Sequence, residues 1–319
     1  MSVALFTLGG TISMAGTRRL TGDDLTAAMP GLPELGHAVE IQDIEKVPSA
    51  NLTAAKLLEV VDAASKAVAA GAAGVVVTQG TDTLEESAFL ADLVWPHPQP
   101  LVFTGAMRNP TLAGPDGPAN LLAALRVACS PAARDLGALV VFKEEIHAAR
   151  WVRKTHSTST ATFVSPNTGP IGHVVEDQVR VLTRPLRLDG VQGNAEPAEL
   201  DTIHVALYTV TLDDDGLLLQ GLADTHQGLV VAGYGVGHVP ATLAPVLGEL
   251  ATRMPVVLTS RTGAGSIVRN TYDSPGSETD LLQRGLIDGG FLDPYKARIL
   301  LRLLLATDDD LAAAFAQYS

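Results

Sequence analysis

Two threonines in this sequence follow a glycine at the point where a short apolar run ends. Thr11 closes the segment LGGT (8–11), and Thr81 lies in QGTD (79–82). A single Gly-Thr junction is most often a tight turn with a helix cap. A cap explains one such threonine but not a facing pair, so we interpret Thr11 and Thr81 as candidates for nucleophilic chemistry.

A lysine among hydroxyl groups completes the set: Lys154 lies in WVRKTHSTSTATF (151–163). Hydrolysis of an amide without a metal requires an attacking hydroxyl, a base that takes its proton, and N–H donors that stabilise the oxyanion. A lysine can act as the base when burial favours its neutral form. Thr11, Thr81, Asp82 and Lys154 are therefore the predicted catalytic residues, with Asp82 orienting the lysine.

The elements that would position these residues alternate between short β-rich runs and longer helical patterns, which is typical of an α/β fold with a parallel sheet. We expect strands at 3–8, 74–78, 101–104 and 138–142, and helices at 53–70, 83–94 and 118–129. Open α/β sheets bind ligands beyond the carboxyl ends of their strands. The junctions after the first three strands, the third being GAMR (105–108), are thus the expected site.

A change of composition divides the chain. The segment RPLRLDGVQGNAEPAELD (184–201) is rich in proline, glycine and charged residues. Its apolar residues follow neither helical nor strand spacing, so it predicts a linker. We therefore expect one α/β domain at 1–183 and a second at 202–319. The second contains apolar runs at 203–210, 229–233 and 255–259 and a helix at 294–306.

Composition limits the partners. A net charge of −13 would repel nucleic-acid phosphates and anionic lipid, and no apolar run approaches the ~18 residues that a membrane span needs. The single cysteine excludes an intramolecular disulfide. We expect a cytosolic protein with a small-molecule substrate, no nucleic-acid partner and no membrane partner.

A nucleotide-binding protein on the same kind of sheet is the alternative from another class. It would need G-x-G-x-x-G after the first strand or a P-loop, and neither motif is present. The glycines at 233, 235 and 237 form only G-x-G-x-G. The eight histidines include no pair at i and i+4, so we predict neither a cofactor nor a metal.

Six segments in order resemble the bacterial-type L-asparaginase family. They are TLGGTIS (7–13), VVTQGTDTLEESAF (76–89), VFTGAMRNPTLAGPDGPANLLAAL (102–125), KTHSTSTATFVSPNTGPIG (154–172), AGYGVGH (232–238) and LDPYKARILL (292–301). The resemblance implies a flavodoxin-like N-terminal domain with a parallel sheet, a smaller C-terminal α/β domain, and hydrolysis of asparagine to aspartate and ammonia. It also implies a homotetramer built from dimers, with sites between subunits.

The resemblance assigns roles to the candidates. Thr11 matches the family's nucleophile on a mobile loop. Thr81, Asp82 and Lys154 match the group that activates the water or the nucleophile.

It adds substrate-binding residues as well. Ser49 matches a serine that contacts the substrate α-carboxylate, and Ala106 lies where backbone meets the leaving amide. Gly10 and Gly80 match backbone that lines the pocket. Glu278, aligned by counting back from LDPYKAR, matches an acid that a neighbouring subunit supplies near the substrate α-amino group.

Several positions depart from the family pattern. Leu8 stands where the family's first signature has threonine, and Gln79 where the second often has histidine. Ala50 stands where many members have a glutamine that binds substrate, and His238 where some have an asparagine. No tyrosine precedes Tyr208, so the usual lid tyrosine has no counterpart in SMAGTRRLTGDDL (13–25).

These departures leave three questions open. We hypothesise that Arg18 or Arg19 closes over the site with Gly16 as a hinge. A glutaminase-asparaginase of broader specificity, and a weak or inactive homologue that binds asparagine, are the remaining alternatives.

Overall fold

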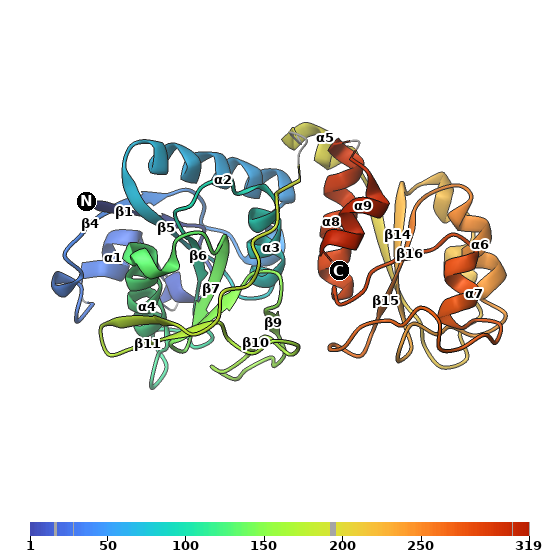
Figure 1. Cartoon of the computed structure of the whole chain (residues 1–319). Coiled ribbons are helices and arrows are strands. Elements are labelled where there is room, and N and C mark those ends of the chain that lie inside the picture. The colour runs from blue at the N-terminus through green and yellow to red at the C-terminus, as the bar shows by residue number, and fades with distance from the viewer. Residues whose placement is uncertain (16–17, 28, 192–195, 308, 319) are drawn as a thin grey trace. The chain divides into compact units, whose positions relative to one another are not determined.

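The computed structural model describes residues 1–15, 18–27, 29–191, 196–307 and 309–318. It divides into two compact units, Met1–Gly190 and Val191–Ser319 (Figure 1). The predicted linker at 184–201 spans this division: residues 192–195 lie outside the described residues, and Pro197–Thr202 forms helix α5. The limits of the linker stay a prediction.

The first unit is built on an eight-stranded sheet with the order β12-β11-β8-β7-β6-β5-β1-β4. Its parallel strands are β1 (Ser2–Thr7), β4 (Ala38–Asp43), β5 (Ala72–Thr78), β6 (Leu101–Thr104) and β7 (Ala138–Phe142). Its antiparallel strands are β8 (Glu145–Ala148), β11 (Gly172–Val175) and β12 (Gln178–Val181). Counted along the chain, the parallel strands lie in the order 2-1-3-4-5, which is the flavodoxin-like arrangement. The expected fold class is confirmed.

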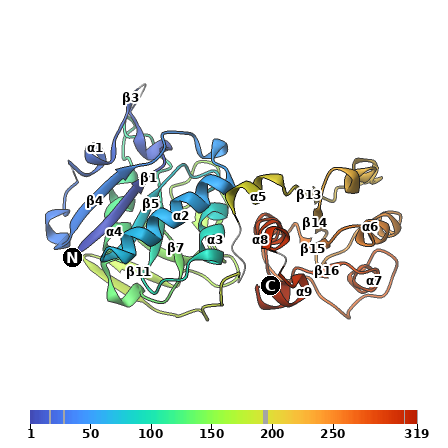
Figure 2. The ribbon, with the colours of Figure 1, turned by 90° about the horizontal axis from the view of Figure 1, so that it is seen from above.

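Helices cover both faces of this sheet, as Figures 1 and 2 show. On one face lie α2 (Ala54–Ala69) and α3 (Leu84–Val94); on the other lie α1 (Gly22–Ala27) and α4 (Gly117–Cys129). Alternate side chains of a strand serve opposite faces, and Val3 and Leu5 of β1 join the core beneath α4. Strands buried on both faces read as continuous apolar runs, which is why the runs at 101–104 and 138–142 predicted their strands correctly.

Short elements connect these layers. They are η1 (Thr11–Ser13), β2 (Met14–Ala15), β3 (Arg18–Arg19), η2 (Pro33–Leu35), η3 (Ser49–Asn51), η4 (Pro131–Ala133), β9 (Arg153–Lys154) and β10 (Phe163–Val164). Strands β2 and β3 pair as an antiparallel hairpin, and β3 projects away from the sheet in Figure 2.

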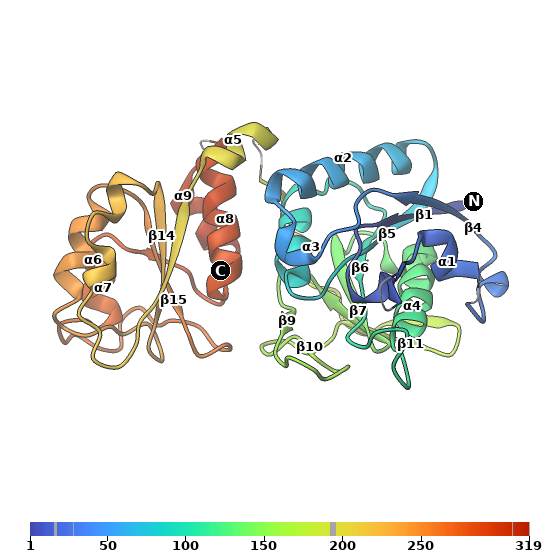
Figure 3. The same ribbon diagram turned by 180° about the vertical axis from the view of Figure 1, so that it is seen from behind.

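The second unit has a four-stranded parallel sheet in the order β13-β14-β15-β16, which confirms the smaller α/β domain. Its strands are β13 (Val205–Thr209), β14 (Gly228–Gly233), β15 (Val256–Ser260) and β16 (Ile287–Asp288). Its remaining helices are η5 (Leu217–Leu219), η6 (Leu222–Asp224), α6 (Ala244–Ala251), α7 (Glu278–Gln283), α8 (Pro294–Thr307) and α9 (Leu311–Tyr318). Figure 3 shows α8 and α9 on one face of the sheet and α6 and α7 on the other.

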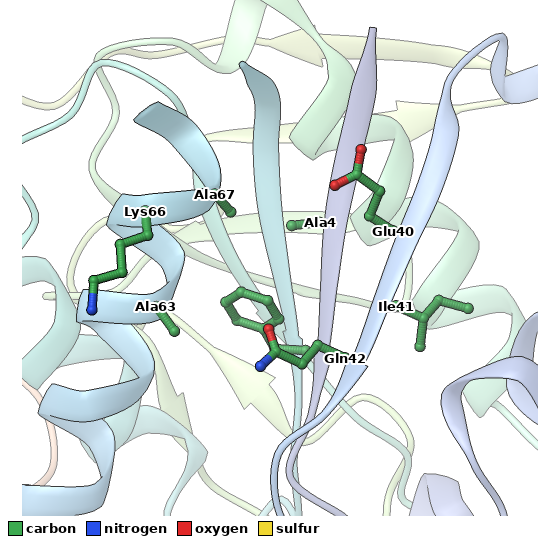
Figure 4. Close-up of a pocket in the computed structure, with 8 residues that line it drawn as sticks. Ala4, Glu40, Ile41, Gln42, Ala63, Lys66 and Ala67 are labelled. Atoms are coloured by element: carbon green, nitrogen blue, oxygen red, sulfur yellow. The ribbon is translucent and has the colours of Figure 1, made fainter. Parts of the chain in front are cut away.

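An open groove of about 570 Å³ lies between α2, strand β1 and the edge strand β4 (Figure 4). Small apolar side chains, among them Ala4, Ala63 and Ala67, line it together with Glu40 and Lys66. None of the predicted site residues lines this groove, so it is distinct from the candidate site. No helix within the described residues is both long and apolar enough to span a bilayer.

Candidate active site

The three glycine-containing junctions lie side by side at the carboxyl edge of the first sheet. The Leu8 N–H donates to the Thr78 carbonyl at 2.8 Å, and the Gln79 N–H donates to the Thr104 carbonyl at 3.1 Å. These bonds join the ends of β1, β5 and β6, which are neighbours in the sheet. The strand order reverses between β1 and β5, and ligands of open α/β sheets bind at such a point.

Two glycines bring the threonine-bearing segments into contact. Gly10 has a φ of +86°, and a Cβ on it would lie 2.2 Å from the Gly80 nitrogen. Both the left-handed conformation and the lack of room require glycine at position 10. Thr11 and Thr81 are the next residues of these two segments, so the two Gly-Thr junctions lie in contact, while the facing of the two threonine side chains stays a prediction.

Lys154 joins the second threonine and its neighbouring acid. Its Nζ lies 2.9 Å from Thr81 Oγ1 and 2.7 Å from Asp82 Oδ1. The lysine side chain is only 15% exposed, while that of Asp82 is 72% exposed. The lysine is therefore largely buried, and its acidic partner lies at the surface. The common alternative, in which a lysine among hydroxyl groups is a solvated surface residue, does not hold for this one.

The strand that carries Lys154 is fixed by packing and by a buried acid. Lys154 pairs with Phe163 in the β9–β10 hairpin, and the Phe163 ring packs on Phe142 of β7 with centroids 4.7 Å apart. The Glu85 carboxylate, in the first turn of α3, accepts a 2.8 Å hydrogen bond from the Lys154 backbone N–H. Glu85 was not among the residues predicted from the sequence; its role depends on a contact with a strand that lies 69 residues further along the chain.

Ser49 lies against the Gly80 turn. A Cβ on Gly80 would lie 2.6 Å from Ser49 Oγ, and the Ser49 carbonyl accepts a 3.1 Å bond from the Thr83 hydroxyl. Ser49 is buried, and among the described residues its Oγ has no hydrogen-bond partner. A buried hydroxyl without a protein partner is suited to bind a ligand oxygen.

The third junction, which carries Ala106, is fixed from two sides. Asp116, at the start of α4, accepts hydrogen bonds from the Met107 and Arg108 N–H groups at 2.8 to 3.1 Å. Asn120, one turn further on, donates to the Gly105 carbonyl at 3.0 Å and accepts from the Lys143 N–H at 2.9 Å. The backbone around the buried Ala106 is therefore rigidly placed.

Replacing Asn120 by alanine is expected to lower the free energy of unfolding by about 1–3 kcal/mol, because the Gly105 carbonyl and the Lys143 N–H lose their buried partner. Urea unfolding of both proteins measures this. Asn51→Ala serves as the control because Asn51 is exposed, and we expect it to change stability by less than about 0.5 kcal/mol. Equal midpoints for the Asn120 variant and the parent would contradict the prediction.

Glu278 belongs to the second unit, at the start of α7, and its side chain is fully buried. Its Oε1 accepts hydrogen bonds from the Thr271 and Tyr272 N–H groups at 2.9 and 2.8 Å, and its Oε2 lies 3.1 Å from His238 Nε2. Burial favours the neutral acid, but these hydrogen bonds outweigh it and hold the pKa of Glu278 below its ordinary value of 4.5.

The G-x-G-x-G segment explains how His238 reaches this acid. It forms a tight turn in which Tyr234 and His238 make an isolated β-bridge. The His238 ring also meets the Tyr272 ring edge-on, with centroids 4.8 Å apart. The glycines thus serve a turn that positions His238.

A Glu278→Gln variant is expected to be less stable at pH 7, with a loss that shrinks at acid pH. Because the folded-state pKa of Glu278 is lowered, its carboxylate stabilises the folded protein above pH 4.5 and loses this contribution as the pH falls through the folded-state pKa. Urea unfolding midpoints from pH 7 to pH 3 measure the difference. Glu249→Gln, at an exposed position of the same unit, is the control, and a difference independent of pH would refute the prediction.

The residues that depart from the family pattern differ in how deeply they are buried. Leu8 and Gln79 are fully buried, and Gln79 donates to Ser87 Oγ at 3.0 Å, which ties the Gly80 turn to α3. Ala50 is exposed in η3. In the segment predicted to form a lid, Arg18 and Arg19 form β3, but their side chains and Gly16 lie outside the described residues. The arginine hypothesis therefore stays a prediction.

Across the ranges that the structure describes, no three histidine, cysteine, aspartate or glutamate side chains gather as a metal site would require. The expectation of a site without metal or cofactor stays a prediction.

Comparisons with known proteins cover both units. A family model described as "Asparaginase, N-terminal" matches residues 2–187, and one described as "Glutaminase/Asparaginase C-terminal domain" matches residues 204–316. The L-asparaginase of Bacillus licheniformis is 34% identical, over 96% of this chain and 95% of the relative. The probable L-asparaginase of Deinococcus radiodurans is 36% identical, over 99% of this chain and 97% of the relative. The crystal structure of a probable cytoplasmic L-asparaginase from Campylobacter jejuni matches with a TM-score of 0.88 at 31% identity, covering 100% of this chain and 99% of the other.

Proposed function

Because this chain belongs to the bacterial-type L-asparaginase family and is accordingly an L-asparaginase, we propose that Thr11 is its nucleophile. We further propose that Thr81, Asp82 and Lys154 form the group that moves the proton. The observation that carries this proposal is the position of Lys154 Nζ, within hydrogen-bond distance of both Thr81 and Asp82.

The reaction divides into two steps. In the first, Thr11 Oγ attacks the side-chain carbonyl carbon of asparagine, its proton passes through Thr81 and Lys154 to the amide nitrogen, and ammonia leaves. In the second, water attacks the resulting aspartyl ester, and the same group takes the proton from the water and returns it to Thr11. Backbone N–H groups of the glycine-rich junctions would stabilise the oxyanion in both steps.

Substrate binding is assigned to the residues around this centre. The buried Ser49 hydroxyl would bind the α-carboxylate, and the fixed backbone at Ala106 would meet the leaving amide. Gly10 and Gly80 would line the pocket without filling it, which their missing side chains allow. Glu278 would bind the α-ammonium group from a neighbouring subunit, because an ionised carboxylate is the matching charge.

Measurement of ammonia release tests the function directly. The purified chain, produced in a host strain that lacks its own asparaginases, is assayed with L-asparagine and with L-glutamine. We expect release from asparagine and a lower kcat/KM for glutamine, since one methylene is worth ~1–3 kcal/mol of discrimination. Absence of release from either amide would overturn the proposal and favour an inactive homologue.

Assembly as a homotetramer built from dimers, in the cytosol, is part of the proposal. The second unit exposes three leucines near each other in sequence, Leu212, Leu217 and Leu218, at 93%, 59% and 82%. Exposed apolar side chains that form a contiguous patch mark interaction surfaces, and we propose that these leucines contribute to one. The cytosolic location is supported by the name of the Campylobacter relative. Light scattering during gel filtration measures the number of 33.2 kDa chains in the assembly.

A further inference from the structure

We propose that Glu85 is a positioning residue for the reaction: by holding the backbone of Lys154, it sets where the lysine's amine end lies relative to Thr81 and Asp82. This inference rests on the proposed function, since it acts through Lys154. Glu85 itself is not placed in contact with the substrate.

Lys154 is held at two points, its backbone N–H and its side-chain Nζ; we call this arrangement a clamp. The backbone N–H of Lys154 donates to Glu85 Oε2 at 2.8 Å, while its Nζ reaches Thr81 and Asp82 at 2.9 and 2.7 Å. All three partners lie in the short segment 81–85, where the chain leaves β5 and enters α3. One rigid piece of chain thus fixes the lysine at its base and at its tip.

Lys154 needs such a clamp because its own strand is short. Strand β9 contains only Arg153 and Lys154, and its paired strand β10 is equally short. A lysine side chain has four rotatable bonds, so the position of its nitrogen is defined only if both ends are held. A shift of about 1 Å in a catalytic group can lower turnover by about 10²-fold.

The surroundings of Glu85 suit a fixed carboxylate. The residue is only 6% exposed, so its carboxylate serves an internal contact rather than solubility. Its place in the first turn of α3 puts the negative charge at the positive end of the helix dipole. The next residue, Glu86, shares that turn and is half-buried, which makes it a matched control for loss of a charge.

Two conservative variants of Glu85 separate the effect of its side-chain length from that of its charge. Glu85→Gln keeps an acceptor oxygen at the same distance but removes the charge, while Glu85→Asp keeps the charge but is one methylene too short. If Glu85 positions Lys154, kcat for ammonia release should stay within about 3-fold in the glutamine variant and fall about 10- to 100-fold in the aspartate variant, with little change in KM. Glu86→Gln should leave kcat unchanged. An aspartate variant as active as the glutamine variant would overturn the proposal.

A double-mutant cycle with Lys154 shows through which residue Glu85 acts. In a Lys154→Met background, measured with a sensitive coupled assay, adding Glu85→Asp should cause no further fall in kcat. An equal fall in both backgrounds would mean that Glu85 has only a general structural role. The cycle also distinguishes the two proposals: if Lys154→Met itself keeps full turnover, the proposed function of Lys154 fails, whereas normal turnover of Glu85→Asp alone refutes only the present one. Urea unfolding of each variant shows that it is folded.

Discussion

Replacing Thr11 by alanine should lower the rate of ammonia release from asparagine by at least about 10⁴-fold, while the variant still folds and binds aspartate. The expected size follows from covalent catalysis, because without the hydroxyl no acyl-enzyme can form, and losing a nucleophile costs about 10⁴- to 10⁶-fold in other hydrolases. Stability should change little, since Thr11 is only half-buried. The measurement is ammonia release at saturating asparagine together with the thermal shift caused by aspartate.

Thr11→Ser is the matched control because serine supplies the same hydroxyl without the methyl group. It should keep far more activity than the alanine variant. An alanine variant within about 10-fold of the parent would show that another group attacks, since such a small loss is below what removal of a nucleophile causes.

Replacing Lys154 by methionine should lower kcat by about 10²- to 10⁴-fold, the range that general acid–base groups contribute. The reason is that the Nζ that contacts Thr81 and Asp82 disappears while the length of the side chain is retained. The steady-state rate of ammonia release measures the effect. Lys66→Met is the control, because Lys66 lies exposed on α2, away from the candidate site.

Lys154→Arg separates proton transfer from charge. Arginine keeps the positive charge but does not give up a proton under ordinary conditions, so it should be nearly as inactive as methionine if the lysine moves the proton. Substantial turnover by the arginine variant would instead assign Lys154 an electrostatic role. Thr81→Val combined with Lys154→Met should cost little more than the worse single change, because residues that act as one unit are not additive.

The sequence predicted most of the parallel scaffold but less of its edges. The runs at 74–78 and 101–104 are continuous and apolar because their strands are covered on both faces, so pattern alone identified them. Strand β4 was not predicted, because as an edge strand it exposes most of its side chains and lacks a long apolar run. The antiparallel strands β8, β11 and β12 are each four residues long, too short for a period to stand out.

The candidate site divides in the same way. The contacts among Thr81, Asp82 and Lys154 could be predicted from residue types and from the resemblance. The clamp by Glu85 could not, because in the pattern LEE (84–86) nothing local distinguishes the acid that is buried from the one beside it. That difference depends on the β9 strand, which lies far along the chain and is brought against α3 only by the fold.

The close contact of Gly10 with Gly80 has a practical consequence for protein engineering. The Ser13 N–H donates to the Gly10 carbonyl at 3.1 Å, and the Leu20 N–H donates to the Ser13 carbonyl at 2.8 Å, so one hydrogen bond joins the two residues that flank positions 14–19. We therefore expect that the sequence between Ser13 and Leu20 can be exchanged. A replacement sequence could carry a tyrosine while the contact of Gly10 with Gly80 is kept, so activity assays of such variants would test whether this segment supplies a partner for Thr11.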